Sequence, residues 1–241
     1  MYKKAIRPVW AEINLTNLDY NIKNIIKKVG PDKEVIGVIK ADAYGHGSIM
    51  CAKVLRENGI KTFAVATLQE AITLRKAGCR EEIIMLGLTP DLYADVIAEY
   101  DVTPVVCDSA NAKAISDAAR QAGKTISGLI AIDTGMGRIG YLADEIETSV
   151  EDIKKIAALS HFRIKGLFSH MSTADAADKT YSHQQEDKYN AFYQALVKAG
   201  VEVPMRTLAN SASIMELPSI HFDAVRPGII LYGCYPSNEV D

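Results

Sequence analysis

Short, continuous apolar runs alternate with longer amphipathic segments along nearly the whole chain, and this alternation restricts the fold more than any other feature. The apolar runs are residues 35–40, 62–67, 82–87, 102–107, 126–133, 164–171, 206–210 and 224–233. Strands of an antiparallel sheet with one wet face alternate apolar and polar residues, whereas parallel strands covered on both faces are apolar throughout. The pattern therefore predicts parallel strands buried beneath helices.

The segments between these runs have helical periodicity and recognisable helix ends. Residues 17–30 begin with an asparagine and close on a glycine, and residues 108–124 begin with the cap candidates Asp108 and Ser109 and close near Gly123. Further helices are expected within residues 47–60, 68–79, 144–160 and 184–200.

Eight strand candidates alternating with helices in 241 residues predict a TIM-type (β/α)8 barrel, whose typical length is about 250 residues. A doubly wound parallel sheet is the alternative. We favour the barrel because chemically notable residues recur at the ends of many strands, whereas a doubly wound sheet gathers them at one crevice.

Charge and cysteine content exclude several classes of protein. The net charge of −3 gives no basic surface for nucleic acid or anionic membranes. The four cysteines are widely separated and form no C-x-x-C motif, so we predict no disulfide or zinc framework. No apolar run is long enough to span a membrane, and the first residues lack the apolar core of a signal peptide. A cytoplasmic protein is expected.

Lys40 ends the first apolar run, in the segment "VIGVIKADAYGHG" (residues 35–47). A lone lysine at a strand end can be no more than a solvated cap. Here the strand is expected to be buried on both faces, so its C-terminal end opens into the barrel mouth. Partial desolvation lowers the pKa of an amine, which is the condition for a lysine to form a Schiff base or act as a base. We predict a catalytic role for Lys40.

The segment "DTGMGRIG" (residues 133–140) contains a literal G-x-G-x-x-G after a strand. A dinucleotide-binding function is rejected, because the motif follows the fifth strand, opens no helix, and the next strand ends without a ribose-binding acid. A loop bent by its glycines, which carries Arg138 over the barrel mouth, explains the segment better.

Two later strand ends carry polar residues. His170 ends the sixth strand, where a structural role and a place in the site are equally compatible with the sequence. Asn210 and Ser211 begin a short helix, whose N–H groups and hydroxyl form either a phosphate cradle or a simple cap.

Arg226 lies inside the last apolar run and needs an acceptor if it is buried. The turn that follows leaves Gly228 and Ile229 able to offer N–H groups to an anion, and phosphate sites after the seventh and eighth strands are frequent in this barrel.

Together these residues place one lysine opposite an anion cradle, with two arginines and a histidine between them. A phosphorylated aldehyde held by a lysine as an imine matches this set. We therefore predict pyridoxal phosphate (PLP) as the cofactor, and no metal site.

The segments "VIKADAYGHG", "DTGMGRIG", "LFSHMSTAD", "LANSAS" and "VRPGIILYG" resemble the alanine racemases in wording, order and spacing. The similarity extends from about Val9 to the last residue, and the first motif is highly specific. The resemblance implies a PLP-binding barrel that interconverts L- and D-alanine and so supplies D-alanine for peptidoglycan.

By this resemblance Lys40 carries the PLP imine and is one of two catalytic bases. Tyr44, Ser211, Gly228 and Ile229 are implied to hold the phosphate.

The resemblance also implies that Arg226 faces the pyridine nitrogen, with His170 hydrogen-bonded to it. Arg138 is implied to lie near the cofactor's phenolic oxygen and the substrate carboxylate. Many family members have a carbamylated lysine two residues before the aspartate of "DTGMGR"; Ala131 occupies that position here, so Arg138 must be braced in another way.

The resemblance divides the chain into three parts. Residues 1–14 are expected to form a strand that pairs with a second, β-rich domain, residues 15–233 form the barrel, and residues 234–241 begin the linker to that domain. Because the second domain supplies the other base, a tyrosine, across a homodimer interface, the 241-residue chain is expected to be nearly inactive. The alternatives are a non-catalytic PLP carrier and a racemase for serine or another small amino acid.

Overall fold

Parallel strands form the centre of the molecule in a computed structural model that describes residues 9–240. The strands that form the barrel are β1 (Glu34–Val38), β2 (Thr62–Val65), β3 (Glu82–Met85), β4 (Val105–Val106), β5 (Ile126–Asp133), β7 (Phe162–Phe168), β8 (Met205–Thr207) and β9 (Ala224–Val225). The short β6 (Tyr141–Leu142) pairs with the end of β5 outside the barrel wall.

The sheet runs in the order β3-β2-β1-β9-β8-β7-β5-β4, and its two edges then meet. An isolated parallel bridge joins Ile84 of β3 to Thr103, just before β4. The Met85 N–H donates to the Thr103 carbonyl at 2.9 Å, and the Thr103 N–H donates to the Ile83 carbonyl at 2.9 Å. The prediction of a TIM-type barrel is therefore confirmed, and the doubly wound alternative is wrong.

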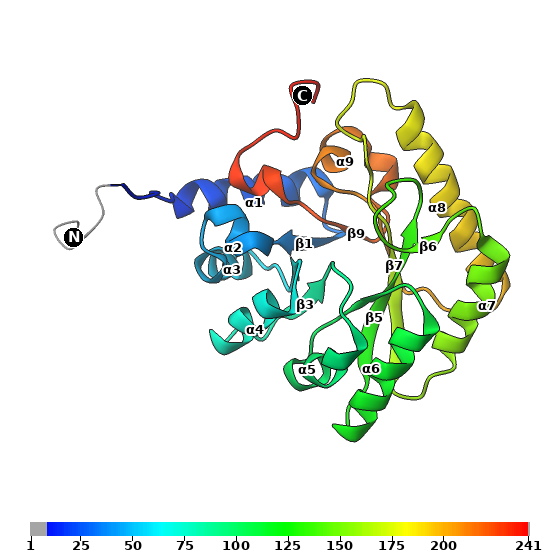
Figure 1. Ribbon diagram of the computed structural model, residues 1–241. Helices are drawn as coiled ribbons and strands as arrows, with labels where there is room; N and C mark the ends of the chain where they lie inside the picture. The colour runs from blue at the N-terminus through cyan, green and yellow to red at the C-terminus, as the bar shows by residue number, and fades with distance from the viewer. Residues whose placement is uncertain (1–8, 241) are drawn as a thin grey trace.

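Helices surround the strands on the outside of the barrel (Figure 1). They are α1 (Leu15–Val29), α3 (Ser48–Glu57), α4 (Leu68–Lys76), α5 (Ala94–Tyr100), α6 (Ser109–Gln121), α7 (Ile146–Ala157), α8 (Thr180–Lys198) and α9 (Ser211–Glu216). Short turns follow some strands: α2 (Lys40–Gly45) after β1, η2 (Asp91–Tyr93) after β3 and η4 (Ile229–Tyr232) after β9. A further short turn, η3 (Pro218–Ile220), follows α9.

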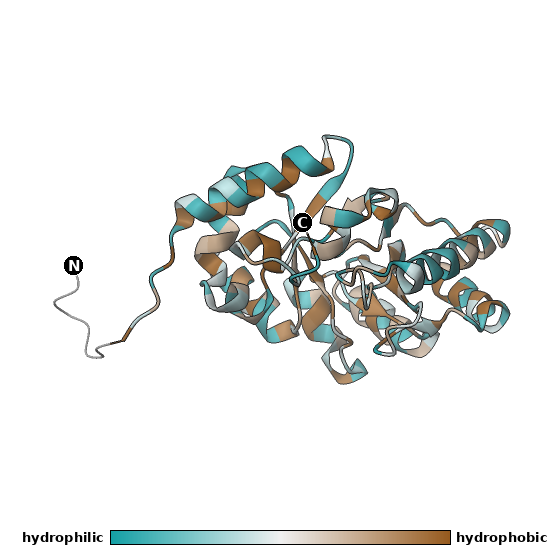
Figure 2. Cartoon of the chain, turned by 90° about the horizontal axis from the view of Figure 1, so that it is seen from above, coloured by the Kyte–Doolittle hydropathy of each residue, from teal (hydrophilic) through white to brown (hydrophobic). Residues whose placement is uncertain are grey.

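Helix ends and buried faces follow from the residues that occupy them. Asp108 caps α6 by accepting from the Asn111 N–H at 2.7 Å, as predicted. Helix α1 begins earlier than predicted, because Asn14 accepts from the N–H groups at the first turn. Apolar and polar residues alternate in stripes along α1 (Figure 2), and the apolar stripe is buried.

The strands bury apolar side chains on both of their faces, as expected for a covered parallel sheet. Val35 of β1 and Ile39, the residue after it, pack in the outer layer between strands and helices, whereas Ile36 and Val38 pack inside the barrel. Ala131 also belongs to the inner layer and is fully buried, so it offers no polar group there.

The structure differs from the prediction in three segments. The last apolar run is a two-residue strand followed by η4, because Pro227 and Gly228 interrupt it. Helix α5 was not predicted from its short sequence of seven residues. Of the predicted strand 1–14, residues 1–8 lie outside the described residues, and residues 9–14 have no regular secondary structure, with Trp10 56% exposed.

The predicted linker packs against the barrel as far as it is described. The Ala177 N–H donates to the Glu239 carboxylate at 2.6 Å, and the Ser237 hydroxyl donates to the Asp175 carbonyl at 2.8 Å. Val240 is buried. Residues 236–240 therefore rest on the loop that follows β7, and whether a further domain begins there stays a prediction.

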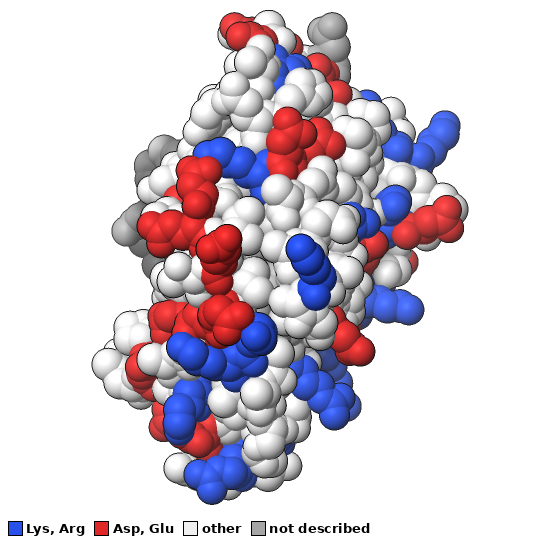
Figure 3. Space-filling model, turned by 90° about the vertical axis from the view of Figure 1, so that its right-hand side faces the viewer, with Lys and Arg blue, Asp and Glu red and all other residues white. Residues whose placement is uncertain are grey.

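Charges of both signs lie on the side of the barrel formed by α7 and α8 (Figure 3). Several are paired, such as Lys188 with Asp144 at 2.8 Å and Lys155 with Asp152 at 3.0 Å. Exposed pairs of this kind contribute little to stability. No helix in the described part of the chain is long and apolar enough to cross a membrane.

Candidate active site

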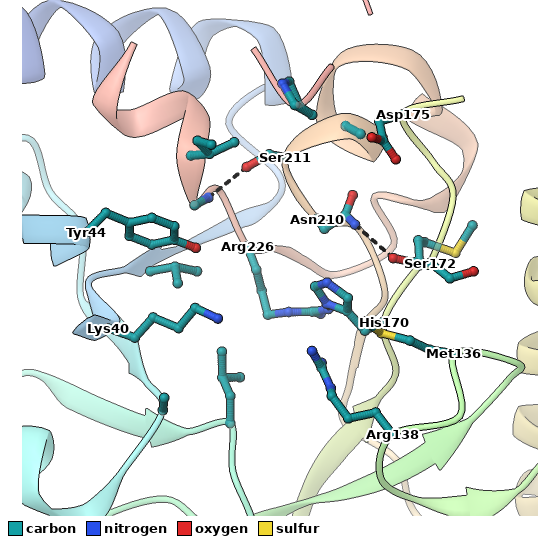
Figure 4. Close-up of a pocket in the computed structure, with 18 of the residues that line it drawn as sticks. Lys40, Tyr44, Met136, Arg138, His170, Ser172, Asp175, Asn210, Ser211 and Arg226 are labelled. Carbon is teal, nitrogen blue, oxygen red and sulfur yellow. Dashed lines mark hydrogen bonds between the residues drawn. The ribbon is translucent and has the colours of Figure 1, made fainter. Parts of the chain in front are cut away.

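A cavity of about 520 Å³ opens at the C-terminal ends of the strands. Its lining includes all the site residues predicted from the sequence: Lys40, Tyr44, Arg138, His170, Asn210, Ser211, Arg226, Gly228 and Ile229. In Figure 4, Lys40 and Tyr44 lie on one side, His170 and Arg138 lie on the other, and Arg226 lies between them. The structure therefore brings together residues from five different strand ends.

Sequence reasoning missed other residues of the cavity wall. Met136, Ser172 and Asp175 line it from the loops after β5 and β7. Met136 and Asp175 lie within the motifs "DTGMGRIG" and "LFSHMSTAD", so the rule that strand-end loops form the mouth would have found them.

Lys40 is delivered to the cavity by an unusual backbone turn. The residues after it, from Ala41 to Tyr44, have φ between 50° and 56° and ψ between 36° and 48°, which is one turn of left-handed helix. Crowding of the side-chain Cβ costs roughly 1–2 kcal/mol for each such residue. The turn therefore persists because its surroundings hold it.

Several local contacts hold this left-handed turn. The Ala43 N–H donates to the Ile39 carbonyl at 2.9 Å, and the Ala43 side chain is fully buried. The Asp42 carboxylate accepts from the Ser48 N–H at 2.7 Å, which ties the turn to the start of α3. As a result Lys40 Nζ lies 6.0 Å from the centre of the Tyr44 ring.

Tyr232 supports the same turn from η4. Its ring packs 5.0 Å from the Tyr44 ring and 4.6 Å from the His46 ring, measured between centroids. Its hydroxyl donates to the Val38 carbonyl at 2.9 Å. Burial raises the pKa of both tyrosines, so both hydroxyls keep their hydrogen at neutral pH and remain donors.

The hydroxyl and backbone groups near Tyr44 form a cradle suited to an anion. The Gly228 N–H donates to Ser211 Oγ at 2.9 Å, and a Cβ at Gly228 would lie 2.8 Å from the Tyr44 hydroxyl oxygen. Ile229 begins η4, where the first N–H groups of a helix have no intrahelical acceptor. A side chain at position 228 would fill the space in which these donors converge.

Asn210 has the capping role that the sequence also allowed. Its side-chain oxygen accepts from the Ser213 N–H at 3.1 Å, and its amide donates to the Met171 carbonyl at 3.1 Å (Figure 4). Asn210 thus fixes the start of α9 against the loop after β7.

Arg226 is buried and donates to the ends of neighbouring strands. Its guanidinium donates to Thr207 Oγ1 at 2.6 Å and to the Ser169 carbonyl at 2.6 Å, and it lies 4.6 Å from the centre of the Phe168 ring. Burial lowers the pKa of Arg226 to about 9, so the guanidinium remains charged at neutral pH.

His170 lies beside this guanidinium, with its Nδ1 at 3.4 Å from an Arg226 nitrogen. Because arginine can only donate, Nδ1 accepts, and the ring hydrogen is assigned to Nε2. Burial, together with the positive charges of Arg226, Arg138 and Lys40, lowers the pKa of His170 to about 3. The imidazole is therefore neutral at physiological pH.

The loop that carries Arg138 is braced through its backbone. The Asp133 carboxylate accepts from the N–H groups of Gly135 and Gly137, at 2.9 Å and 3.0 Å. Tyr181 of α8 donates to the Gly135 carbonyl at 2.7 Å. These contacts hold the Arg138 loop in place. Ala131, which is fully buried, contributes no polar group to it.

Helix α8 also fixes the loop that carries His170. Gln185, one turn after Tyr181, is fully buried and donates to Thr134 Oγ1 at 3.1 Å and to the His170 carbonyl at 3.1 Å. Its oxygen accepts from the Ser172 N–H at 2.9 Å. One face of α8 therefore holds both the Arg138 loop and the His170 loop.

Comparison with known proteins agrees with this geometry. The family model "Alanine racemase, N-terminal domain" matches residues 13–236. The alanine racemase of Clostridium kluyveri is 54% identical over 241 residues, which are all of this chain and 61% of that protein.

The chain belongs to the alanine racemase family.

Solved structures of alanine racemases have the same fold. The enzyme from Clostridium difficile 630 is 39% identical with a TM-score of 0.95, over 99% of this chain and 62% of that one. The Bacillus anthracis enzyme with bound L-Ala-P is 32% identical with a TM-score of 0.91, over 98% of this chain and 60% of that one. The chain thus spans about three-fifths of the length of these alanine racemases. Within residues 9–240 no group of three or more His, Cys, Asp or Glu side chains is placed to hold a metal ion.

Replacing Ala41 by glycine should stabilise the protein, because Ala41 is exposed and has a φ of 50°. We expect the free energy of unfolding to rise by about 0.5–1 kcal/mol. Ala191→Gly, at an exposed position inside the right-handed helix α8, should lower it by about 1 kcal/mol. Urea unfolding of both variants tests the pair, and a loss of stability in Ala41→Gly would contradict a left-handed turn in solution.

His170 should make the fold sensitive to acid. The unfolded chain binds a proton at this residue below about pH 6.5, whereas the folded chain does so only near pH 3. The unfolded state therefore takes up more protons as the pH falls, and stability falls with it. Between pH 7 and pH 5, the free energy of unfolding of the unaltered chain should fall by about 2 kcal/mol in urea unfolding. His170→Asn should remove this fall. Equal losses in the two proteins would show that His170 is not held neutral by the fold.

Proposed function

We propose that this protein is the PLP-binding barrel of an alanine racemase, which interconverts L- and D-alanine and so supplies D-alanine for peptidoglycan. The observation that carries the proposal is the cavity itself. Among the described residues that line it, Lys40 is the one lysine, and it faces the cradle of Tyr44, Ser211 and Gly228. Similarity to alanine racemases over the whole length of the chain supports the same reaction.

The residues present fit PLP. The cavity volume of about 520 Å³ lies in the range of about 300–1,000 Å³ that is usual for small-molecule sites. The cradle offers hydroxyl and N–H donors and lacks the side chain that would obstruct a phosphate at Gly228. Lys40, Arg138 and Arg226 add three positive charges to the lining, against one carboxylate from Asp175. This balance favours an anionic ligand.

When bound, PLP supplies an electron-withdrawing ring that makes the α-hydrogen of an attached amino acid acidic. The chain's own residues would hold the cofactor and move the proton. Lys40 would bind the cofactor aldehyde covalently and later carry the proton to or from the substrate Cα on one face. The charged Arg226 would donate to the ring nitrogen, with the neutral His170 behind it, and Arg138 would bind the substrate carboxylate.

Racemisation needs a proton donor or acceptor on each face of the substrate carbon. We propose that Lys40 acts on one face and that a tyrosine acts on the other, from a part of the full-length protein that this chain does not include. The chain spans 61% of its Clostridium kluyveri relative, which leaves room for such a part. We further propose that the full-length protein is a cytoplasmic homodimer.

Adding PLP to the protein should produce the absorbance band of a lysine imine, because Lys40 lies beside the cradle. Borohydride should then fix the cofactor on Lys40, which peptide mass spectrometry can locate. Lys40→Ala should abolish the band, whereas Lys53→Ala, which removes an exposed lysine of α3, should leave it unchanged. A band of equal size in Lys40→Ala would overturn the assignment of the imine to this residue.

The 241-residue chain alone should racemise alanine slowly even when saturated with PLP. Loss of one of two proton-transfer groups lowers rates by on the order of 10²–10⁴-fold. We expect a rate lower by that factor than the rate of a full-length alanine racemase assayed in parallel, with L-alanine and L-serine as separate substrates. A rate close to that of the full-length enzyme would sink the proposal that the second base is missing, and a preference for serine would change the substrate.

A further inference from the structure

Glu70, on the first turn of α4, uses both of its carboxylate oxygens in an unusual way. It forms a capping box with Thr67: the Glu70 N–H donates to Thr67 Oγ1 at 3.3 Å, and Glu70 Oε2 accepts from the Thr67 N–H at 3.1 Å. These two bonds are all that a capping box requires. Yet Oε2 also accepts from the Ala66 N–H at 2.7 Å, and Oε1 accepts from the Ala41 N–H at 2.7 Å, 29 residues away in the sequence.

These two additional donors come from the ends of two neighbouring strands. Strands β1 and β2 pair in parallel with Val38 opposite Ala64, and the Ile39 N–H still donates to the Ala64 carbonyl at 2.9 Å. If the ladder continued, its next N–H donors would be those of Ala66 and Ala41. Both of these N–H groups donate to the Glu70 carboxylate. The carboxylate therefore replaces the backbone carbonyls that would accept from them if the strands continued to pair.

We propose that Glu70 is a positioning residue for Lys40. Its carboxylate stands between the diverging ends of β1 and β2 and binds the N–H group that directly follows Lys40. That N–H belongs to the first residue of the left-handed turn, so Glu70 determines where the turn begins and in which direction Lys40 leaves the strand. The role of Lys40 in this proposal rests on the proposed function; the placement of the backbone does not.

Only a carboxylate of this length serves all of these donors. Three N–H groups converge on Glu70, and an ionised carboxylate accepts on both oxygens, with bonds strengthened by its charge. A glutamine has one acceptor oxygen and would turn its NH₂ group toward at least one of the N–H donors. An aspartate keeps both oxygens but is one methylene shorter, so it can serve the helix end or Ala41 but not both.

The matched variants are Glu70→Gln and Thr67→Ala. Thr67→Ala removes the hydroxyl half of the same capping box and leaves the bonds from Ala41 and Ala66 in place. Both variants weaken the N-terminal cap of α4. Glu70→Gln alone also disturbs the ends of β1 and β2, at Ala41 and Ala66. Glu70→Asp serves in its place if the glutamine variant does not fold. All proteins are compared at a temperature where urea unfolding shows each to be fully folded.

The first measurement uses no cofactor. Amide hydrogen exchange should show the Ala41 N–H protected in the unaltered chain and in Thr67→Ala, and exchanging at least about tenfold faster in Glu70→Gln. Equal protection in the two variants would overturn the placement.

The second measurement follows imine formation with PLP, in which the Lys40 amine bonds to the aldehyde carbon and the aldehyde oxygen leaves as water. Pyridoxine 5′-phosphate, which has no aldehyde, reports the cradle alone. Glu70→Gln should weaken imine formation about tenfold or more, because a small misplacement of a reacting group is costly. Its binding of pyridoxine 5′-phosphate should stay within about twofold, and Thr67→Ala should retain both within about twofold.

Equal imine formation in the two variants would overturn the positioning role. If the unaltered chain forms no imine, the proposed function fails, and the hydrogen-exchange comparison still decides whether Glu70 places the backbone after Lys40.

Discussion

Closure of the parallel barrel is the constraint on which the rest of the structure depends. Because all strands run in the same direction, their C-terminal ends meet at one rim, and every polar residue that follows a strand is brought to that rim. The bridge between Ile84 and Thr103 joins the last open edges. Because the barrel is closed there, one cavity is surrounded by the ends of β1, β5, β7, β8 and β9.

The charge of Arg226 links this closure to the chemistry of the cavity. A buried guanidinium is costly unless acceptors surround it, and its acceptors lie at the ends of β7 and β8, in Ser169 and Thr207. Arg226 therefore holds neighbouring strand ends in place while it keeps a positive charge within the mouth. Burial, together with that charge and those of Arg138 and Lys40, lowers the pKa of His170, so the imidazole beside Arg226 is neutral. The resulting site is cationic and attracts anions.

The sequence predicted the barrel and its site because the signals for both are local. Each strand is a continuous apolar run, and each site residue lies within a few positions of a strand end. Because the C-terminal ends of all strands in such a barrel meet at one face, these local signals are enough to predict that the site residues lie together. The segments that differed are those in which local signals are weak or conflict. Helix α5 has seven residues, and the apolar run after Arg226 continues through Pro227 into a turn that apolarity alone cannot distinguish from a strand.

What could not be predicted is how the site residues are held, because those contacts join parts of the chain that are distant in sequence. A glutamate in the first turn of α4 is explained fully by its capping box, and nothing in its own segment indicates that it also binds Ala41. In the same way, nothing in the sequence around Gln185 and Tyr181 indicates that their side chains bind the loops after β5 and β7. The strand ends bring the cavity-lining residues together, and polar side chains on helices bind the backbone of the loops that carry them. The geometry of the cavity therefore depends on helix positions that carry no chemical signature of their own.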